Sequence, residues 1–396
     1  MRVTRGRWEP EPAHGGPRID LERSSELHQH RQVIRHCYPA MEAPSTPLRP
    51  QMVSIMVSPY GVVRSAGDNR QSVRPVIGLR CSDGAHYRRS MNETPHLLPL
   101  PDRKPVDDAV ARRLITAQFP QWSHLEVRPV DMQGWDNRTF RLGDEMLVRL
   151  PTAEEYALAV RKEQRWLPIL APALPLEIPV PLAGGVPDEG FPHDWSVYRW
   201  IDGDPADRVD VADMTMFAVG LAEFLLSLRQ VDPADGPGPG LHNWFRGGPL
   251  STYDGWARAS LEPLDGLIPA KTAEEIWERA LRAPWDGRPV WFHGDIAPGN
   301  ILLRDGELAA VIDFGTCGVG DPACDLAIAW TTLTGDSRAA FRDRMAVDDA
   351  TWQRGQGWAL WKALVVCAGS VRDGEGMPPN ASSVLDEILA AYEQSD

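Results

Sequence analysis

The chain has 396 residues, of which 43% are hydrophobic and 24% are charged, so it can bury a sizeable core in one two-lobed unit or in two domains. Acidic residues outnumber basic residues by 55 to 41, and the net charge of −14 argues against a protein that binds the phosphate backbone of nucleic acids. No apolar run is long enough to span a membrane and the five cysteines include no C-x-x-C pair, so we expect a cytoplasmic protein with no membrane partner.

Residues 1–90 differ in composition from the rest of the chain. They contain 14 arginines, no lysine and 8 acidic residues, a net charge of +6, so residues 91–396 carry −20. Apart from a strand-like run at 52–63, this stretch shows no helical or strand period. We interpret it as disordered or as a non-native extension, with the functional chain starting at Met91. A basic arm for nucleic acid or membrane and a regulatory or targeting tail are the alternatives.

Residues 91–201 are predicted to form a small lobe built on an antiparallel sheet. Apolar residues between 106 and 115 share one helical stripe. Strand patterns at 124–130 and 139–149, the second broken by a tight turn at 143–145, precede a helix predicted over 153–167, with Pro168 just beyond its end. Further strands are expected within 174–187 and 195–203.

Residues 202–396 are predicted to form a larger, mainly helical lobe. Phe217, Leu221, Phe224, Leu225 and Leu228 share one helix face, and helical patterns follow at 276–281, 326–332 and 358–366. The fold class is therefore α+β, with two lobes that meet near Trp200 and enclose a cleft.

The segment from Val290 to Ile328 carries the strongest chemical pattern. A loop containing His293 and Asp295 follows an apolar strand, and a predicted hairpin brings Asn300 and Asp313 to the same end of two adjacent strands. Phosphoryl transfer needs this set: a carboxylate that orients or deprotonates a hydroxyl, and two oxygen ligands for Mg²⁺. By residue type alone, a hydrolytic metal site and an Asp/Asn-rich turn are the alternatives.

The motifs HGDIAPGN, IDFG and GDPACDLA, in this order, resemble those of the aminoglycoside phosphotransferase/choline kinase-like family, distant relatives of protein kinases. The resemblance implies a protein-kinase-like fold. It also implies that Asp295 is the catalytic base, that Asn300 and Asp313 bind Mg²⁺, that His293 braces the catalytic loop, and that Asp325 is a buried residue hydrogen-bonded to that loop.

The resemblance extends over the small lobe, where the sequence departs from the family pattern. The segment GWDN at 134–137 replaces a glycine-rich phosphate loop; Asn137 is a candidate phosphate contact there, and a plain hairpin turn is the alternative. Arg149 stands where the family has a nucleotide-binding lysine. Lys162 is a second candidate, interpreted as a solvated helix charge. Glu163 lies within an apolar helical stripe, which favours a buried partner of Arg149 over a surface residue.

The segment SVYRWIDGD resembles the hinge that binds adenine through its backbone, so Arg199 and Ile201 are candidate cofactor contacts, while Trp200 can instead be a packing residue. The other tryptophans near the motifs, Trp195, Trp291 and Trp330, are expected in the core.

The resemblance implies ATP or GTP as donor and a small hydroxylated molecule as acceptor. A cationic acceptor such as an aminoglycoside would gain from acidic residues in the cleft, and a solvated acidic face is the alternative. The candidates are Asp202, Asp204, Asp207, Asp210, Asp254, Glu262 and Asp265. The apolar segment 352–366 equally suits a macrolide-type acceptor, and a non-catalytic nucleotide-binding scaffold is the alternative to an enzyme. The pattern predicts no oligomeric state.

Overall fold

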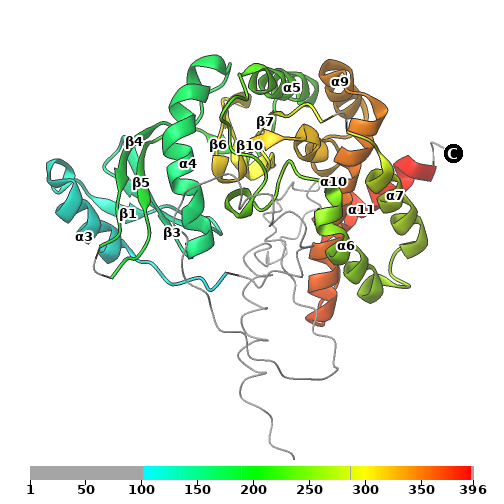
Figure 1. Cartoon of the computed structure of the whole chain (residues 1–396), viewed down its shortest axis with the longest axis horizontal. Helices are drawn as coiled ribbons and strands as arrows, with labels where there is room; N and C mark the ends of the chain where they lie inside the picture. The colour runs from blue at the N-terminus through cyan, green and yellow to red at the C-terminus, as the bar shows by residue number, and fades with distance from the viewer. Residues whose placement is uncertain (1–100, 132, 189, 286, 394–396) are drawn as a thin grey trace, which may run out of the picture.

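The computed structural model describes residues 101–131, 133–188, 190–285 and 287–393 (Figure 1). The predictions for residues 1–90, including the strand at 52–63 and the start at Met91, lie outside the described residues. Among the helices within the described ranges, none is long and apolar enough to cross a lipid bilayer.

The first part of the described chain is an antiparallel sheet of five strands, as predicted. The strands lie in the order β1-β2-β3-β5-β4, and two helices accompany them. Their bounds are α3 Asp108–Gln118, β1 Val127–Pro129, β2 Asn137–Leu142, β3 Met146–Pro151, α4 Glu154–Leu170, β4 Pro181–Gly185 and β5 Trp195–Arg199. The tight turn predicted at 143–145 joins β2 to β3.

Strand alternation decides which side chains of this sheet reach the rest of the molecule. Val148 and Leu150 of β3 are fully buried in a cluster that includes Leu114 and Ile115 of α3. Because successive side chains of a strand point to opposite faces, Arg149 leaves the sheet on the other side, where α4 packs. Arg149 therefore extends from the N-terminal sheet toward α4 and the chain segments beyond it.

Helix α4 is longer than the sequence predicts. It continues through Pro168 and ends at Leu170, whereas the prediction ended it at Leu167. A proline within a helix removes one backbone hydrogen bond and crowds the preceding turn. Here Leu167 and Leu170 are both buried, and the packing of these two side chains offsets that loss.

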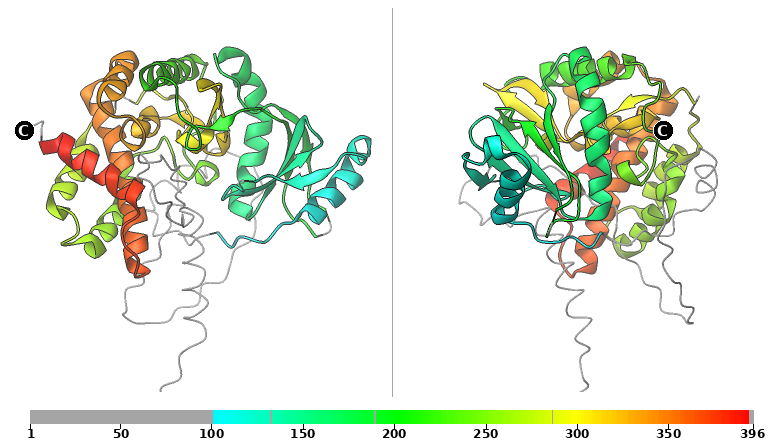
Figure 2. Two further views of the ribbon diagram at one scale, coloured as in Figure 1. Left: turned by 180° about the vertical axis from the view of Figure 1, so that it is seen from behind. Right: turned by 60° about the vertical axis from the view of Figure 1, so that its left-hand side comes forward.

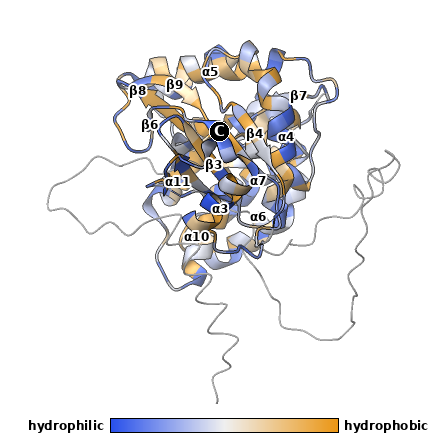
Figure 3. Cartoon of the chain, turned by 90° about the vertical axis from the view of Figure 1, so that its left-hand side faces the viewer, coloured by the Kyte–Doolittle hydropathy of each residue, from blue (hydrophilic) through white to orange (hydrophobic). Residues whose placement is uncertain are grey.

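The rest of the chain is mainly helical and lies to the other side of α4 (Figure 2). Its helices are α5 Met214–Gln230, α6 Asp254–Leu261, α7 Ala270–Arg282, α8 Ile328–Thr331, α9 Gly335–Met345, α10 Asp349–Arg372 and α11 Pro379–Glu393. Figure 3 shows hydrophobic and hydrophilic residues alternating along α4 and α5, as expected for helices with one buried face. The helix predicted at 326–332 is instead a 3-10 turn at Pro322–Ala327 followed by the single turn of α8.

Two small sheets position the motif segments. Strands β6 Asp204–Pro205, β8 Ile301–Arg304 and β9 Glu307–Val311 form one of them, and β7 Val290–Phe292 pairs with β10 Gly318–Gly320 in the other. The predicted hairpin is therefore present as β8 and β9, with Ile301 opposite Val311.

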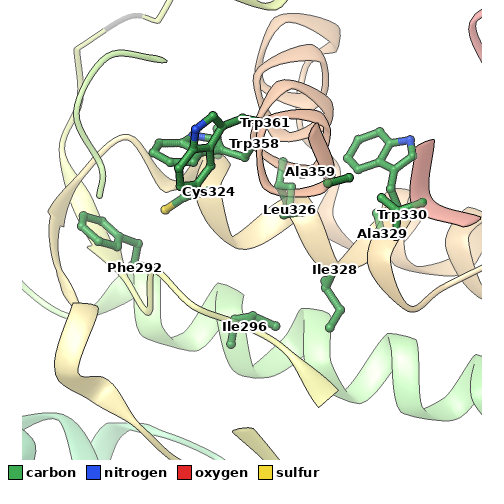
Figure 4. Packing of buried hydrophobic residues seen from close by; sticks show 14 of the residues in the cluster. Phe292, Ile296, Cys324, Leu326, Ile328, Ala329, Trp330, Trp358, Ala359 and Trp361 are labelled. Atoms are coloured by element: carbon green, nitrogen blue, oxygen red, sulfur yellow. The ribbon is translucent and has the colours of Figure 1, made fainter. Parts of the chain in front are cut away.

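A large apolar cluster supports these small sheets from the helical side. Phe292 and Ile296 flank the loop after β7, and Trp358 and Trp361 of α10 lie close by with Cys324 (Figure 4). All five are buried. Trp195, Trp291 and Trp330 are buried as well, which confirms the prediction that they belong to the core.

Candidate active site

The loop after β7 brings His293 and Asp295 to the junction between the two small sheets. Gly294 between them has a φ of +88°, and a Cβ added there would come within 2.7 Å of the backbone oxygen of Thr316. Only glycine adopts this conformation without strain and also lets the two segments approach so closely. The chain reversal at Gly294 therefore sets the direction of the Asp295 side chain.

Asp325 holds this loop from behind through both of its carboxylate oxygens. They accept hydrogen bonds from the backbone N–H groups of His293, at 3.0 Å, and Gly294, at 2.7 Å. Asp325 is almost completely inaccessible to solvent, and burial raises its pKa, with His293 and the two N–H groups acting in the opposite direction. These contacts are the ones that the sequence resemblance implies for Asp325.

His293 joins the same loop to the end of β9. Its Nδ1 accepts from the Asp295 N–H at 3.2 Å, and its Nε2 lies 3.0 Å from the Ile312 carbonyl oxygen. The hydrogen-bond pattern assigns the proton to Nε2, which donates to that carbonyl. Burial lowers the pKa of His293, so the ring is neutral and acts as a structural bridge.

The hairpin places Asn300 and Asp313 at the same end of β8 and β9, as predicted, and Asn300 also contacts Asp295. Asn300 Nδ2 donates to the backbone oxygen of Asp295 at 2.9 Å and lies 3.3 Å from its Oδ2. The Ile312 N–H donates to the Asn300 carbonyl at 2.8 Å, which ties the two ends of the hairpin together. Asp313, the next residue, has a left-handed φ of 65° and turns the chain out of the hairpin.

Arg149 links the N-terminal sheet to this hairpin. Its Nη2 lies 2.7 Å from Asp313 Oδ1, and its Nη1 lies 3.6 Å from Glu163 Oε1. Glu163 also accepts a hydrogen bond from the Tyr198 hydroxyl. Burial alone would lower the pKa of Arg149, but Asp313 and Glu163 together raise it above its usual value. The predicted pairing of Arg149 with Glu163 is present, and the contact with Asp313 is an addition that the sequence did not indicate.

Asp295 has a partner that sequence reasoning missed. Lys362 of α10 places its Nζ 2.7 Å from Asp295 Oδ1, and its side chain is only 7% exposed. Burial alone would raise the pKa of Asp295, but Lys362, and after it Arg246, lowers that pKa below its usual value. The sequence contained a signal for a buried lysine here, because Lys362 is the single charged residue in the apolar run GWALWKAL. The same kind of pattern identified Glu163.

Lys162 is buried, contrary to the sequence interpretation. It was expected to be a solvated helix charge, but it is buried, and its Nζ donates to the backbone oxygens of Gly315 at 2.7 Å and Cys317 at 2.9 Å. Burial lowers its pKa. The adjacent residues Lys162 and Glu163 therefore join α4 to the segment that begins at Asp313, Lys162 directly and Glu163 through Arg149.

The GWDN segment forms one wall of a pocket between the sheet and α4. Asp136 and Asn137 line it together with Glu163, His242 and Gly315. Burial, the Asp313 carboxylate and, more weakly, Asp295 raise the pKa of Asp136 to about 8. Asn137 therefore lines the same pocket as Glu163, the partner of Arg149, and Asp136 is a half-buried acid whose raised pKa the sequence did not indicate.

The hinge candidates lie at the other end of the β3–β5 pair. Arg199 pairs with Met146, and Arg149 pairs with Ser196, so Arg199 is about 10 Å further along the strand. The Arg199 N–H donates to the Val180 oxygen at 2.9 Å, and the Arg199 side chain is exposed.

Beyond Arg199, the hinge residues are engaged within the protein. The N–H of Trp200 donates to the Glu145 oxygen at 2.8 Å, and the Arg141 guanidinium lies 3.8 Å from the centre of its ring. Ile201 is 9% exposed and packs with Leu302 and Ala310. The Trp200 ring is therefore packed against Arg141 at the junction, as one of the two sequence interpretations held.

The acidic residues proposed for a cationic acceptor do not form one group. Asp202, Asp204 and Asp210 are exposed after the hinge, as are Glu262 and Asp265, whereas Asp207 is half-buried. Asp254 instead accepts from Arg258 and from the Trp277 indole, both at 2.8 Å, on the α6–α7 surface. The structure thus favours the solvated acidic face for most of this set.

Asn300 and Asp313 fit the ligand preference of Mg²⁺, which takes one or two protein oxygens and completes its shell with phosphates and water. Because the Nδ2 atom of Asn300 is turned toward Asp295, the oxygen of the same side-chain amide points away from Asp295. Within the described residues, no group of three or more His, Cys, Asp or Glu side chains is arranged to hold a metal ion.

Known proteins share both the sequence pattern and the fold. The sequence model of the phosphotransferase enzyme family matches residues 126–359, whereas no curated protein sequence matches the chain. The GDP complex of aminoglycoside 2′-phosphotransferase-IIIa is similar over 74% of this chain and 100% of its own, with 17% identity and a TM-score of 0.53. The GDP and kanamycin complex of APH(2″)-IIIa is similar over 72% of this chain and 99% of its own, with 18% identity and a TM-score of 0.53. At these identities the likeness establishes the shared fold, an antiparallel sheet followed by a helical part.

Proposed function

The chain belongs to the phosphotransferase enzyme family, and we propose that it transfers the γ-phosphoryl group of ATP or GTP to a hydroxyl group of a small antibiotic or metabolite. The observation that carries the proposal is the convergence of Asp295, Asn300 and Asp313, with Asn300 in contact with Asp295 and bonded through its carbonyl to the residue before Asp313. Two loops from the two small sheets meet here, Arg149 of β3 contacts Asp313 and is paired with Glu163 of α4, and Lys362 of α10 contacts Asp295. A solvated Asp/Asn-rich turn would not be held from four directions.

In the proposed reaction, the oxygen of the acceptor hydroxyl forms a bond to the γ-phosphorus while the bond to the oxygen bridging the β- and γ-phosphates breaks. Asp295 accepts a hydrogen bond from that hydroxyl, aims its oxygen at the phosphorus and receives the proton as the new bond forms. The Asp295 carboxylate is held by Lys362 on one oxygen and by Asn300 near the other. This fixed geometry supplies the orientation on which phosphoryl transfer chiefly depends.

The donor side is assigned to Asn300, Asp313 and Arg149. Asn300 and Asp313 would hold Mg²⁺, which neutralises charge on the nucleotide phosphates when it is bound. Arg149 keeps the positive charge of the lysine that it replaces, and its planar group reaches two carboxylates with two different nitrogens. Asn137 lines the adjoining pocket and is the proposed phosphate contact in the GWDN segment.

The test is a transfer assay with ATP and GTP, in the presence of Mg²⁺, against a panel that includes aminoglycosides and macrolides, read by mass spectrometry for an added phosphoryl group. GTP is included because a protein of this fold was solved with GDP. Asp295→Ala should lower kcat at least 100-fold, since general base catalysis contributes about 10²- to 10⁴-fold. The matched control is Asp305→Asn, an exposed turn residue of the same hairpin, which should retain activity.

Two outcomes would overturn the proposal. Equal turnover by Asp295→Ala and the parent protein would remove Asp295 from the mechanism. Nucleotide binding without transfer to any acceptor would favour the non-catalytic scaffold.

A further inference from the structure

The partners of Asp295 restrict the charge that an acceptor can carry, a conclusion that rests on the proposed function. The whole sequence contains only four lysines, and two of them, Lys162 and Lys362, are buried. Lys162 donates to backbone oxygens, whereas Lys362 has a carboxylate partner, the proposed catalytic Asp295, at 2.7 Å. Lys362 comes from α10, 67 residues further along the chain, and lies beside Trp358 and Trp361 on that helix.

A second buried cation stands behind the same loop. Arg246 is 3% exposed, and its Nε donates to the Gly294 oxygen at 3.1 Å, one residue before Asp295. Its guanidinium carbon lies 5.1 Å from the centre of the Trp358 ring and 5.0 Å from that of Trp361. Two cations of the protein, Lys362 and Arg246, thus compensate the charge of the Asp295 carboxylate. The rings of Trp358 and Trp361 lie against Arg246.

The pairing of Asp295 with Lys362 restricts the charge of a group that can bind beside Asp295. A carboxylate that lacks an internal partner attracts ammonium groups of a ligand, because each charge compensates the other. Asp295 is 18% exposed and already has its counter-charge, Lys362. An ammonium group hydrogen-bonded to Asp295 would lie within about 7 Å of Lys362 Nζ, since each charge-assisted hydrogen bond is about 2.8 Å long. At that separation, in a partly desolvated cleft, two cations repel each other appreciably.

We propose that Lys362 is a specificity-determining residue that excludes ammonium groups from the neighbourhood of the reacting hydroxyl. The acceptor is then a hydroxyl compound that is neutral or anionic around that hydroxyl. A polyamine whose ammonium groups flank the hydroxyl is disfavoured. The net charge of −20 on residues 91–396 pointed toward a cationic acceptor, but Asp202, Asp204 and Asp210 after the hinge are exposed, and Asp295 is paired with Lys362.

The experiment compares matched acceptors, each an amine and its N-acetylated derivative, with kanamycin and per-N-acetylkanamycin as one pair. The parent protein should show a higher kcat/KM for the acetylated members. Lys362→Gln, which keeps a hydrogen-bond donor without the charge, should shift the ratio of kcat/KM toward the amines at least tenfold, and Lys362→Arg should retain the parent ratio. Lys271→Gln, at a lysine whose side chain is 90% exposed, is the control. A purely structural role of Lys362 would lower both rates and leave their ratio unchanged.

A binding measurement separates this inference from the proposed function, because it does not require turnover. Spermidine, titrated calorimetrically, should bind Lys362→Gln at least tenfold more tightly than the parent protein. The gain should disappear in Lys362→Gln with Asp295→Asn, because the carboxylate left without its cation is then neutral. An unchanged spermidine affinity in folded Lys362→Gln, or an unchanged acceptor ratio, overturns the role of Lys362. Absence of transfer to every acceptor by the parent protein overturns the proposed function, and with it the assignment of an acceptor class.

Discussion

Arg149→Met removes the cation that holds two carboxylates at the junction between the sheet and the hairpin. The side chains of Arg149, Glu163 and Asp313 are 16%, 6% and 23% exposed, so water compensates little of the lost charge. Removing one partner of a buried ion pair costs about 3–5 kcal/mol, since the remaining charge stays buried without compensation. Because Asp313 is partly exposed, we expect a loss near the lower end, about 3 kcal/mol in the free energy of unfolding.

The assay is urea denaturation at pH 7.5, analysed as a double-mutant cycle. Glu163→Gln removes the negative charge while its amide can still bond to the Tyr198 hydroxyl. In the double variant, the penalty for an unpaired Glu163 disappears, so the coupling free energy should be about 1–3 kcal/mol. The matched control is Arg344→Met, which breaks an exposed pair with Glu223 and should cost about 1 kcal/mol or less.

The reasoning would be refuted by an Arg149→Met variant as stable as Arg344→Met, or by additive effects in the cycle. Either result would show that the two carboxylates find compensation elsewhere, and that Arg149 does not join the sheet to the hairpin. A loss of nucleotide binding at unchanged stability would instead assign Arg149 to the ligand alone.

Three further changes test other groups of the site. The pKa of Asp136 is raised to about 8, so the folded protein retains a proton that the unfolded chain loses above pH 4, and stability falls as pH rises between these values. Asp136→Asn should therefore gain over the parent by about 1.4 kcal/mol per pH unit between pH 5 and 7, measured by urea denaturation. Burial lowers the pKa of His242 to about 4, so the unfolded chain takes up a proton first as pH falls. The parent should lose about 3 kcal/mol between pH 6.5 and 4 through this group, and His242→Gln should lack that loss in acid denaturation. Asp325→Ala leaves the N–H groups of His293 and Gly294 without acceptors, and should lower the free energy of unfolding by about 3 kcal/mol in urea.

Three results would contradict the predictions for Asp136, His242 and Asp325. A pH-independent effect of Asp136→Asn would mean that this acid is ionised in the folded protein. An acid-denaturation curve of His242→Gln that matches the parent would show that His242 is protonated in the folded state. For Asp325, unchanged stability together with unchanged activity would show that it does not support the loop that carries Asp295.

Much of the site could be predicted because its residues follow one another in the chain. The loop with His293 and Asp295, the hairpin from Asn300 to Asp313, and the later Asp325 lie within 33 residues, and turn chemistry with strand pairing places them together. Helical periodicity was enough to predict that Glu163 is buried. Strand alternation places the Arg149 side chain on the face of the sheet that α4 covers. These are local patterns, with periods that one segment displays by itself.

Other features depended on contacts between distant segments. Pro168 lies within α4 because Leu170 packs in the core, and a local rule that ends helices before proline does not include that packing. Lys162 was interpreted as solvated, since a charge on a helix is usually exposed, but the segment after Asp313 covers it. Arg199 and Ile201 were candidate backbone contacts for a nucleotide, with Trp200 between them a contact or a packing residue, and only the folded structure shows that the N–H groups of Arg199 and Trp200 are bonded to the Val180 and Glu145 oxygens.

The sequence by itself therefore determined the two-part fold, the order of the motifs and the residues that carry the proposed phosphoryl transfer. The tertiary structure alone decided which charges compensate one another: Arg149 with Asp313 across 164 residues, and Lys362 with Asp295 across 67. Periodicity shows that a charged side chain faces the interior, but an interior charge is stable only with a partner, and the partner is chosen by how the segments pack. The acidic composition suggested a cationic acceptor, whereas the folded structure shows that Asp295, the proposed catalytic carboxylate, is already paired with a cation of the protein, Lys362.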